Sequence, residues 1–337
     1  MRTRRIVFTG RGQAALEDAD IPDAPLTPHE VLLRTAHSVI SPGTELANYT
    51  GDHTLFPNPD RYPIYPGYAA VGEVIAAGRE AAVRIGDRVL AHVPHCAFAR
   101  FDSRAHVCVR VPDGVAPVQA TLARIAQVSA ASIGLMAARP GDRAAVIGLG
   151  LVGNLAAQLL RRAGLTVLGV EPLAARRGLA ERCGITQTLD PALLKEGAAE
   201  RDATTSSCRV ALECSGQDRG LLTALSLVAP RGEVFLVGAA WKRSTDVIAA
   251  DITRPIFTKY LAVRSGWEWQ IPLYGEWSLG SIAGCTDWIL ACLRDGTLHV
   301  ADLITDRVSP AEVPAAYADL LEHPAKHLGV VIDWERT

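Results

Sequence analysis

The sequence has little of several residue types, and each shortage argues against a class of protein. Its 337 residues hold two methionines, four lysines and 6% aromatic residues, and 34 Lys+Arg nearly balance 36 Asp+Glu for a formal charge of −2. A near-neutral chain without a basic run has no electrostatic footprint for nucleic acid or for an anionic membrane. We therefore expect neither kind of partner, and instead a small-molecule ligand.

No stretch of the sequence is long and apolar enough to suggest a membrane span. The longest apolar stretch, residues 144–160, contains Asn154, Gln158 and three glycines, whereas a span needs about 20 consecutive apolar residues. The N-terminus is basic but leads into a short strand-like run without a signal-peptide core. We expect a cytoplasmic protein.

The seven cysteines suggest neither disulfides nor a structural zinc lobe. Their number is odd, and no two have the Cys-x-x-Cys spacing of a zinc lobe or redox motif. They are typical of free, mostly buried thiols in a reducing compartment.

The first part of the chain, residues 1–118, favours β-structure. Proline- and glycine-rich turns separate short β-prone runs, for example 31–36, 70–75 and 88–93. Such spacing predicts a partly open barrel or a sandwich.

The second part, residues 119–265, alternates strands and helices after a helical stretch at 118–138. Repeated β-α-β order predicts an α/β fold with a doubly wound parallel sheet. The last part, 266–337, is expected to return to the first domain. The predicted strands are 144–148, 166–170, 210–214 and 233–237, and the helices between them are 155–163, 174–183 and 221–228.

A glycine-rich motif follows the first strand of this α/β region. Gly148, Gly150 and Gly153 form G-x-G-x-x-G, and Leu151 and Val152 open the next helix. The first glycine permits a tight turn, the second lets the backbone approach a pyrophosphate, and the third lets the helix pack on the strand. The motif predicts a dinucleotide held at the helix N-terminus.

An acidic residue follows at the spacing that suits the adenosine ribose. Glu171 ends the next strand, 171 − 153 = 18 residues after the last glycine, with Pro172 behind it. A carboxylate there hydrogen-bonds ribose hydroxyls and repels a 2′-phosphate, which favours NAD over NADP. Arg176 and Arg177 follow closely, so a phosphate partner, and with it NADP, stays open.

Two later strand ends are candidates for the rest of the cofactor site. Cys214 and Ser215 close one strand, and Gly238 and Ala239 close another. Both lie at the carboxyl edge of a doubly wound sheet, where ribose and nicotinamide rest. Ordinary strand-to-helix turns are the alternative.

With these motifs in this order, the chain resembles the medium-chain dehydrogenase/reductase superfamily. The phrases that carry the likeness are Pro66-Gly67, Gly86-Asp87-Arg88-Val89 and the nucleotide-binding fold. The resemblance implies a GroES-like β domain, a Rossmann domain and a homodimer. No tyrosine has a lysine four positions later, so the dyad of the short-chain superfamily is missing.

The departures from that superfamily concern zinc. Its zinc-dependent members carry a cysteine near the position of Ser41 and Gly-His-Glu where this chain has Gly67-Tyr68-Ala69. The four-cysteine lobe is absent as well. The segment 38–45 together with Pro66-Gly67-Tyr68 is similar to a zinc-lacking subgroup that includes hydroxyethyl-bacteriochlorophyllide dehydrogenases, so we expect no metal.

Without zinc, side chains must handle the proton and the charge that develops on oxygen. His95 is the predicted acid/base, because an imidazole titrates near neutral pH. There are two alternatives to this role. His95 could form a metal site with His92 and Cys96, or it could be an ordinary loop residue.

Hydroxyl groups are the predicted partners of that histidine. Ser41, Thr44 and Tyr68 would donate to the oxyanion or relay the proton. Glu45 either orients one of them or pairs with Lys326 or His327 as a structural ion pair.

An aromatic-dense stretch follows the nucleotide fold. Trp267, Trp269, Tyr274 and Trp277 stand out in a chain with few aromatics. They are predicted to line a pocket for a ring or sugar-like substrate, with a dimer interface or core packing as the alternative.

These patterns predict a zinc-independent NAD(H) oxidoreductase that interconverts a secondary alcohol and a ketone on a biosynthetic intermediate. An NADPH-dependent enoyl or quinone reductase is one alternative. A non-catalytic NAD-binding sensor or scaffold is the other.

Overall fold

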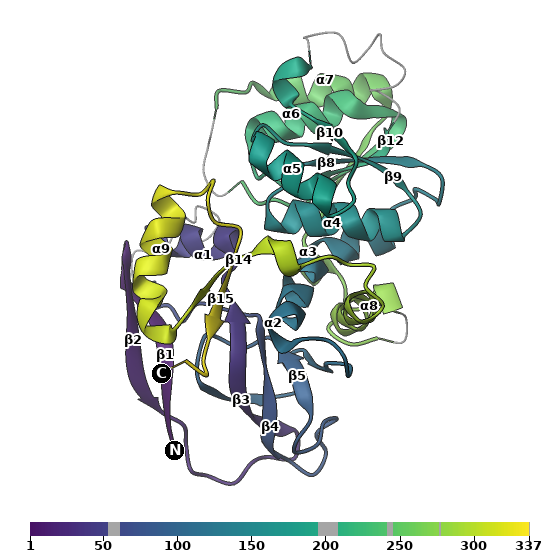
Figure 1. Cartoon of the computed structure of the whole chain (residues 1–337). Helices are drawn as coiled ribbons and strands as arrows, with labels where there is room; N and C mark the ends of the chain where they lie inside the picture. The colour runs from purple at the N-terminus through teal and green to yellow at the C-terminus, as the bar shows by residue number, and fades with distance from the viewer. Residues whose placement is uncertain (53–60, 195–207, 241–244, 276–277, 337) are drawn as a thin grey trace. The chain divides into compact units, whose positions relative to one another are not determined.

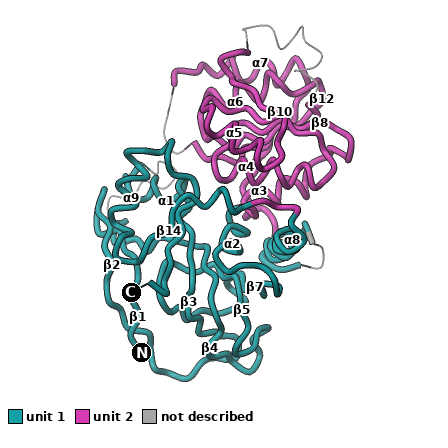
Figure 2. The backbone as a smooth tube through the Cα atoms, in the orientation of Figure 1, with its two compact units in different colours: residues 1–125, 272–296, 300–337 teal, residues 126–271, 297–299 magenta. Residues whose placement is uncertain are grey.

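The computed structural model describes residues 1–52, 61–194, 208–240, 245–275 and 278–336. The chain divides into two compact units, which Figure 2 shows in two colours. Unit 1 comprises residues 1–125, 272–296 and 300–337, and unit 2 comprises residues 126–271 and 297–299. The architecture is α/β, with a GroES-like β domain and a doubly wound Rossmann domain (Figure 1).

Unit 1 is built on β-structure. A hairpin of two antiparallel strands stands beside a seven-stranded sheet with the order β14-β15-β3-β4-β5-β7, in which β6 also pairs with β3. The strands are β1 (Arg2–Gly10), β2 (Gln13–Asp20), β3 (Glu30–Val39), β4 (Ala70–Ala77), β5 (Arg88–Ala91), β6 (Phe98–Asp102), β7 (Cys108–Arg110), β14 (Ile304–Val308) and β15 (Gly329–Asp333).

Strand β3 is central to this sheet because it pairs with three others, β4, β6 and β15. Val31 and Leu33 are completely buried and pack with Val74, Val89 and Phe101 in one core cluster. Irregularities between Leu32/Leu33 and Thr35/His37 shift the register against β4. The carboxyl end of β3 leads directly into the candidate site.

The helices of unit 1 include one that the sequence analysis does not predict. Helix α1 (Pro42–Thr50) starts with Pro42 in its first turn and stops at Gly51, whose φ is +73°. Proline is pre-organised for the first helical turn, and glycine accepts the left-handed conformation after the last. The others are α2 (Pro117–Ala120), α8 (Ile282–Arg294), α9 (Val313–Glu322), η3 (Ser278–Gly280), η4 (Ala301–Leu303) and η5 (Pro310–Glu312).

Unit 2 contains a six-stranded sheet in which every pairing is parallel, with the order β10-β9-β8-β11-β12-β13. In chain order this is 3-2-1-4-5-6, the arrangement of a doubly wound dinucleotide-binding sheet. The strands are β8 (Arg143–Ile147), β9 (Thr166–Val170), β10 (Gln187–Leu189), β11 (Cys208–Glu213), β12 (Val228–Leu236) and β13 (Ala262–Ser265).

Helices connect these strands, as parallel pairing requires. The core lies where they cover the sheet: Ala145, Val170, Ala211, Leu225 and Val234 are buried in one cluster. The helices are α4 (Leu151–Arg162), α5 (Ala174–Arg182), α6 (Asp218–Leu227) and α7 (Ala249–Lys259), with η1 (Pro191–Leu193) and η2 (Glu268–Gln270). Helix α3 (Leu122–Leu135) carries the chain from one unit to the other.

Two predicted helices start earlier than their apolar spacing indicated. Helix α4 starts at Leu151, directly after its N-cap Gly150, rather than at residue 155, and helix α6 starts at Asp218 rather than at residue 221. Helix α8 starts at Ile282, where the Ser281 hydroxyl accepts a hydrogen bond from the Gly284 N–H and caps the helix.

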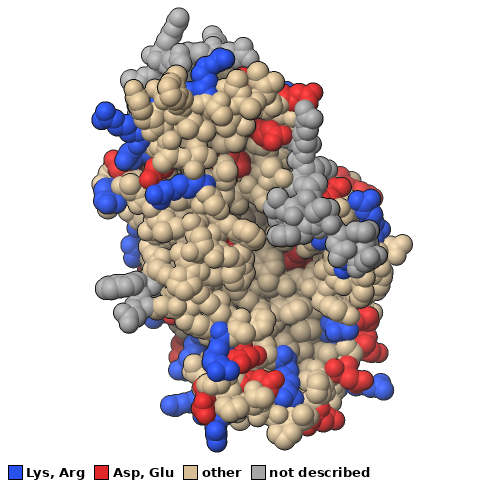
Figure 3. Space-filling model, turned by 180° about the vertical axis from the view of Figure 1, so that it is seen from behind, with Lys and Arg blue, Asp and Glu red and all other residues tan. Residues whose placement is uncertain are grey.

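Two properties bear on the class of partner. Within the described residues, no helix is long and apolar enough to cross a membrane. In the lower part of the face that Figure 3 shows, Lys and Arg side chains are interspersed with Asp and Glu.

Candidate active site

A buried carboxylate organises the candidate site in unit 1. Glu45, 1% exposed, lies in the first turn of α1. Its Oε1 accepts the Ser41 N–H at 2.9 Å, and its Oε2 lies 3.1 Å from His95 Nε2 and accepts the Tyr317 hydroxyl. The three donors compensate the charge, which would otherwise be costly to bury.

His95 lies inside the protein, and both of its ring nitrogens have partners. It is 0% exposed, and its Nδ1 lies 2.8 Å from Ser38 Oγ, which also accepts the Trp334 Nε1–H at 2.9 Å. The indole can only donate, so Ser38 Oγ accepts from Trp334. A carboxylate can only accept, so the His95 Nε2–H donates to Glu45, a role assigned from the network.

A hydroxyl pair lies beside this network. The Tyr68 hydroxyl donates to Ser41 Oγ, and Tyr68 is partly exposed. The Ser41 side chain therefore does not cap α1, although its residue occupies the N-cap position. Gly67 precedes Tyr68 with φ +99°, and a Cβ there would stand 2.6 Å from the His95 backbone nitrogen. Glycine at this position lets the Tyr68 loop pack against His95.

Tyr317 is a neutral donor in this arrangement. Burial, followed by the charge of Glu45, holds the pKa of Tyr317 well above its ordinary value. The ring packs against Phe8 and Tyr49 in a cluster of aromatic side chains. Tyr317 therefore fixes one carboxylate oxygen from a completely buried position.

The structure pairs Glu45 with His95, not with Lys326 or His327. His327 is engaged elsewhere, with Asp306 at 2.8 Å and Asp319 at 2.7 Å. The predicted ion pair with either residue near the C-terminus is thus wrong, because a closer histidine already occupies the carboxylate. Thr44, on the same turn of α1, is partly buried.

Sequence reasoning missed four members of this environment: Ser38, Arg124, Tyr317 and Trp334. The sequence separations of the contacts explain why, since Tyr317 is 272 residues from Glu45 and Trp334 is 296 residues from Ser38. No local pattern marks such residues. The only sequence feature that could have indicated Tyr317 and Trp334 is that each is an aromatic residue in a segment predicted to return to the first domain.

The donors gathered here do not fit a zinc ion. Zinc in proteins takes Cys, His or carboxylate ligands in tetrahedral geometry, whereas Ser41 and Tyr68 offer hydroxyls and Glu45 and His95 are bonded to each other. Among the described residues, His92, His95 and Cys96 do not form a group whose ligand atoms lie close enough together to hold a metal ion. Burial raises the pKa of Cys96 to about 12, so in the absence of a metal ion its thiol keeps its proton at neutral pH.

Elsewhere in the described part of unit 1, one group has metal-ligand spacing. His37, Asp333 and Glu335 offer atoms within 4.8 Å of one another, but Asp333 already forms an ion pair with Arg336 at 3.2 Å. Burial holds the pKa of His37 below its ordinary value. The group has no residue in common with the Glu45 network.

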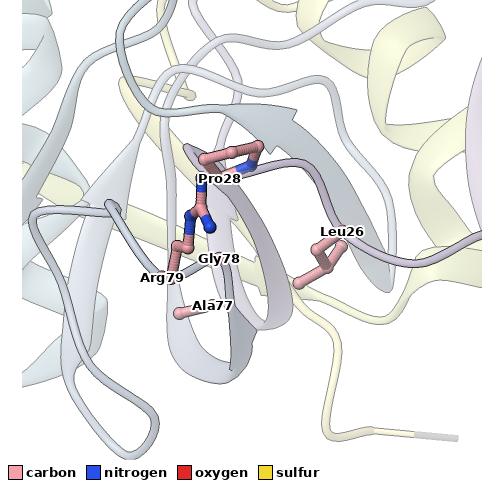
Figure 4. A pocket seen from close by; sticks show the side chains of 5 residues that line it. All are labelled: Leu26, Pro28, Ala77, Gly78 and Arg79. Atoms are coloured by element: carbon pink, nitrogen blue, oxygen red, sulfur yellow. The ribbon is translucent and has the colours of Figure 1, made fainter.

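Two surface hollows also lie in unit 1. One of about 500 Å³, shown in Figure 4, is lined by Leu26, Pro28, Ala77, Gly78 and Arg79 and shares no residue with the network. The other, of about 550 Å³, has His37 and Trp334 in its lining. Only the second touches the network, through the indole that donates to Ser38.

The glycine motif in unit 2 adopts the conformation that a dinucleotide requires. Gly148 has φ +85°, and a Cβ at Gly153 would stand 1.8 Å from the Gly148 carbonyl oxygen. A Cβ at Gly150 would meet only Arg176 Nη1, at 3.9 Å. The backbone before Leu151 and Val152, the first residues of α4, therefore has room beside it for a phosphate.

The carboxylate of Glu171 bonds to backbone groups of its own domain. It is 3% exposed, and its carboxylate oxygens accept the N–H groups of Leu149 at 2.9 Å and Leu173 at 3.0 Å. These bonds tie the glycine loop to the end of β9. Arg177 donates to the carbonyls of Glu171 and Pro172 and to Asp190, and Arg176 lies beside the loop, where its Nη1 is 3.9 Å from a Cβ built at Gly150.

The ends of β8, β11 and β12 converge. A Cβ at Gly148 would stand 2.9 Å from the Ser215 Cβ, one at Gly153 3.3 Å from the Cys214 Cβ, and one at Gly238 2.4 Å from the Gly216 nitrogen. A Cβ at Gly216 would stand 2.6 Å from the Ala239 carbonyl oxygen. These residues surround the point between β8 and β11 where the strand order reverses, so they fit a dinucleotide.

The aromatic stretch is divided between the units. Trp267 and Trp269 are each 53% exposed in unit 2. Tyr274 belongs to unit 1, where its hydroxyl donates to backbone carbonyls of Ser103 and His106. Trp277 lies outside the described residues.

Comparisons with known proteins agree with this architecture. The family model "Alcohol dehydrogenase GroES-like domain" matches residues 27–138, and "Zinc-binding dehydrogenase" matches residues 152–270. The chain is 29% identical to 2-desacetyl-2-hydroxyethyl bacteriochlorophyllide A dehydrogenase of Cereibacter sphaeroides over 100% of both chains. It is 27% identical to D-guloside 3-dehydrogenase of Escherichia coli, over 96% of this chain and 98% of the other.

The fold is also that of solved dehydrogenase structures. A Sinorhizobium meliloti protein solved with bound NADP superposes with a TM-score of 0.79 at 19% identity, over 99% of both chains. The chain belongs to the zinc-type alcohol dehydrogenase-like medium-chain dehydrogenase/reductase superfamily and is an oxidoreductase.

Proposed function

We propose that the protein is a zinc-independent, NAD(H)-dependent oxidoreductase that interconverts a secondary alcohol and a ketone on a biosynthetic intermediate. The observation that carries the proposal is the buried network of Glu45, His95 and Ser41, which ends at the Tyr68 hydroxyl. This network supplies an ordered proton donor where zinc-dependent relatives place metal ligands.

The names of two relatives support the substrate class. One acts on the hydroxyethyl group of a bacteriochlorophyllide, and the other at position 3 of a D-guloside. Both groups are secondary alcohols whose oxidation gives a ketone. A ring-shaped or sugar-like substrate is consistent with the exposed Trp267 and Trp269, which we propose, together with Trp277, as its contacts.

We assign the proton step to Tyr68 and Ser41, not to His95. A general acid must lie within hydrogen-bond reach of the reacting oxygen, and His95 is completely buried with both nitrogens occupied. Tyr68 is partly exposed and bonded to Ser41. His95 and Glu45 then act as positioning residues, and Thr44 is a further hydroxyl donor.

The proposed cofactor is NAD. Its nicotinamide accepts or releases the hydride when it is bound. Gly148, Gly150 and Gly153 would hold the pyrophosphate, and the carboxylate of Glu171 would repel a 2′-phosphate even though backbone N–H groups share it. Cys214, Ser215, Gly238 and Ala239 would border the ribose and nicotinamide.

One observation favours the second candidate, an NADPH-dependent enoyl or quinone reductase. Arg176 lies beside Gly150, and an arginine near the loop accommodates a 2′-phosphate in NADP-binding relatives of this fold. A homodimer and the domain limits 118/119 and 265/266 stay predictions.

The test is an alcohol and ketone panel with NAD(H) and NADP(H), using protein freed of metal by chelation. Hexosides and aryl hydroxyethyl compounds represent the two substrate classes. Loss of the acid should lower kcat of Tyr68→Phe by about 10²-fold or more. Tyr65→Phe, the same change three residues earlier at an exposed ring, should leave kcat near that of the unmodified protein. A requirement for added zinc would refute the proposal.

A further inference from the structure

A buried guanidinium lies over the ring of Tyr68. Arg124, in the first turn of α3, is 2% exposed, and its Cζ lies 4.6 Å from the centroid of the Tyr68 ring. Arginine is seldom buried so completely without a specific partner. The position of this charge therefore needs an explanation in terms of what it contacts.

Within the described residues, Arg124 is a cation that faces the ring of Tyr68. Glu45 accepts hydrogen bonds from Ser41, His95 and Tyr317, and Tyr317 in turn senses the charge of Tyr68. Burial, followed by the charge of Arg124, holds the pKa of the nearby His92 well below its ordinary value. His92 is thus neutral at physiological pH and adds no second positive charge.

A cation over an aromatic face is attracted to the ring, and more strongly when water is excluded. The attraction grows when the phenol ionises, since the ring system then carries a full negative charge. A guanidinium group keeps its positive charge over the ordinary pH range. It therefore favours the ionised form of Tyr68 at every pH at which the protein is folded.

We propose that Arg124 stabilises the phenolate of Tyr68 and thereby makes this tyrosine the acid/base of the reaction. The inference rests on the proposed function. In alcohol oxidation, the phenolate would take the hydroxyl proton of the substrate and become a neutral phenol, while a bound nicotinamide would supply the hydride acceptor that lets the alcohol become a ketone. In ketone reduction the phenol returns that proton. Arg124 is a positioning residue, because it acts through Tyr68.

The experiment is a pH titration of tyrosinate ultraviolet absorbance on the whole chain without substrate. Subtracting the Tyr68→Phe titration isolates Tyr68. The midpoint should rise by about one pH unit or more in Arg124→Met, and the pH dependence of kcat should move with it. Arg34→Met removes a surface arginine that is 59% exposed and paired with Glu73, and it should leave the midpoint unchanged.

Arg124→Lys and Arg124→Gln keep the proposal testable if the methionine variant does not fold. Lysine retains a cation and should keep the midpoint within about half a pH unit of the unmodified protein, whereas glutamine should raise it. Equal midpoints in all forms, or equal displacement by lysine and glutamine, would overturn the role of Arg124. The titration needs no cofactor, so a displaced midpoint in a protein that oxidises no alcohol would contradict the proposed function alone.

Discussion

Replacing Glu45 with glutamine should destabilise unit 1 strongly. The glutamine oxygen can still accept the Ser41 N–H, but the side-chain NH₂ then faces the Tyr317 hydroxyl and the His95 Nε2–H, two donors that meet the carboxylate in the native protein. Hydrogen bonds to a charged group contribute about 1.5–3 kcal/mol each, and leaving buried donors unpaired adds to the loss. We expect the free energy of unfolding to fall by about 3–5 kcal/mol.

Thermal and urea unfolding measure this change. For a domain of about this size, 1 kcal/mol corresponds to about 2–4 °C, so Tm should fall by about 10 °C. The control is Glu73→Gln, the same substitution at a 47% exposed glutamate paired with Arg34 in the same unit, and it should change stability by less than about 0.5 kcal/mol. If the free energy of unfolding of Glu45→Gln lies within about 1 kcal/mol of the native value, the hydrogen bonds of Glu45 do not stabilise this site.

Three further predictions concern other parts of the chain. Gly150→Ala should leave the fold intact but abolish stabilisation by dinucleotide. Gly153→Ala should also lower the Tm of the free protein, because its Cβ would stand 1.8 Å from a backbone oxygen. Equal Tm values for the two variants would contradict this. The hydrogen bonds from Arg100 and from the Thr27 backbone hold the pKa of Glu30 at about 2, below its ordinary 4.5. The native protein should therefore be more stable than Glu30→Gln above about pH 4.5, and this difference in the free energy of unfolding should vanish as pH falls toward 2. Acid unfolding curves of the two proteins measure it. Burial raises the pKa of Cys96 to about 12, so iodoacetamide at neutral pH should modify it only after denaturation, as peptide mass spectrometry would show.

The nucleotide-binding half could be predicted from the sequence because its signals are local. The glycine spacing, the apolar strand before it and Glu171 all fall within one β-α-β unit, and sterics at Gly148 and Gly153 leave little choice of residue. The usual right-handed crossover of such units then restricts the topologies that the parallel sheet can adopt.

The candidate site in unit 1 could be predicted only in part. Ser41, Glu45 and Tyr68 stand near recognisable motifs, but the partners that decide their roles come from β3, α3, α9 and the residue after β15. Burial determines whether His95 exchanges a proton with the substrate or only positions its neighbours. No sequence pattern indicates that a histidine is 0% exposed. Helix α1 could have been predicted from the sequence, because Ser41-Pro42 and Gly51 are ordinary helix start and stop signals.

The most direct measurement of the central claim is the thermal stability of chelator-treated protein with NADH or NADPH, with zinc content assayed on the same sample. A ligand at 100 times its Kd stabilises the native state by about 2.7 kcal/mol. We predict that NADH produces this stabilisation, that NADPH produces much less, and that zinc is far below one ion per chain. Stabilisation by NADPH alone, or one zinc retained per chain, would contradict it.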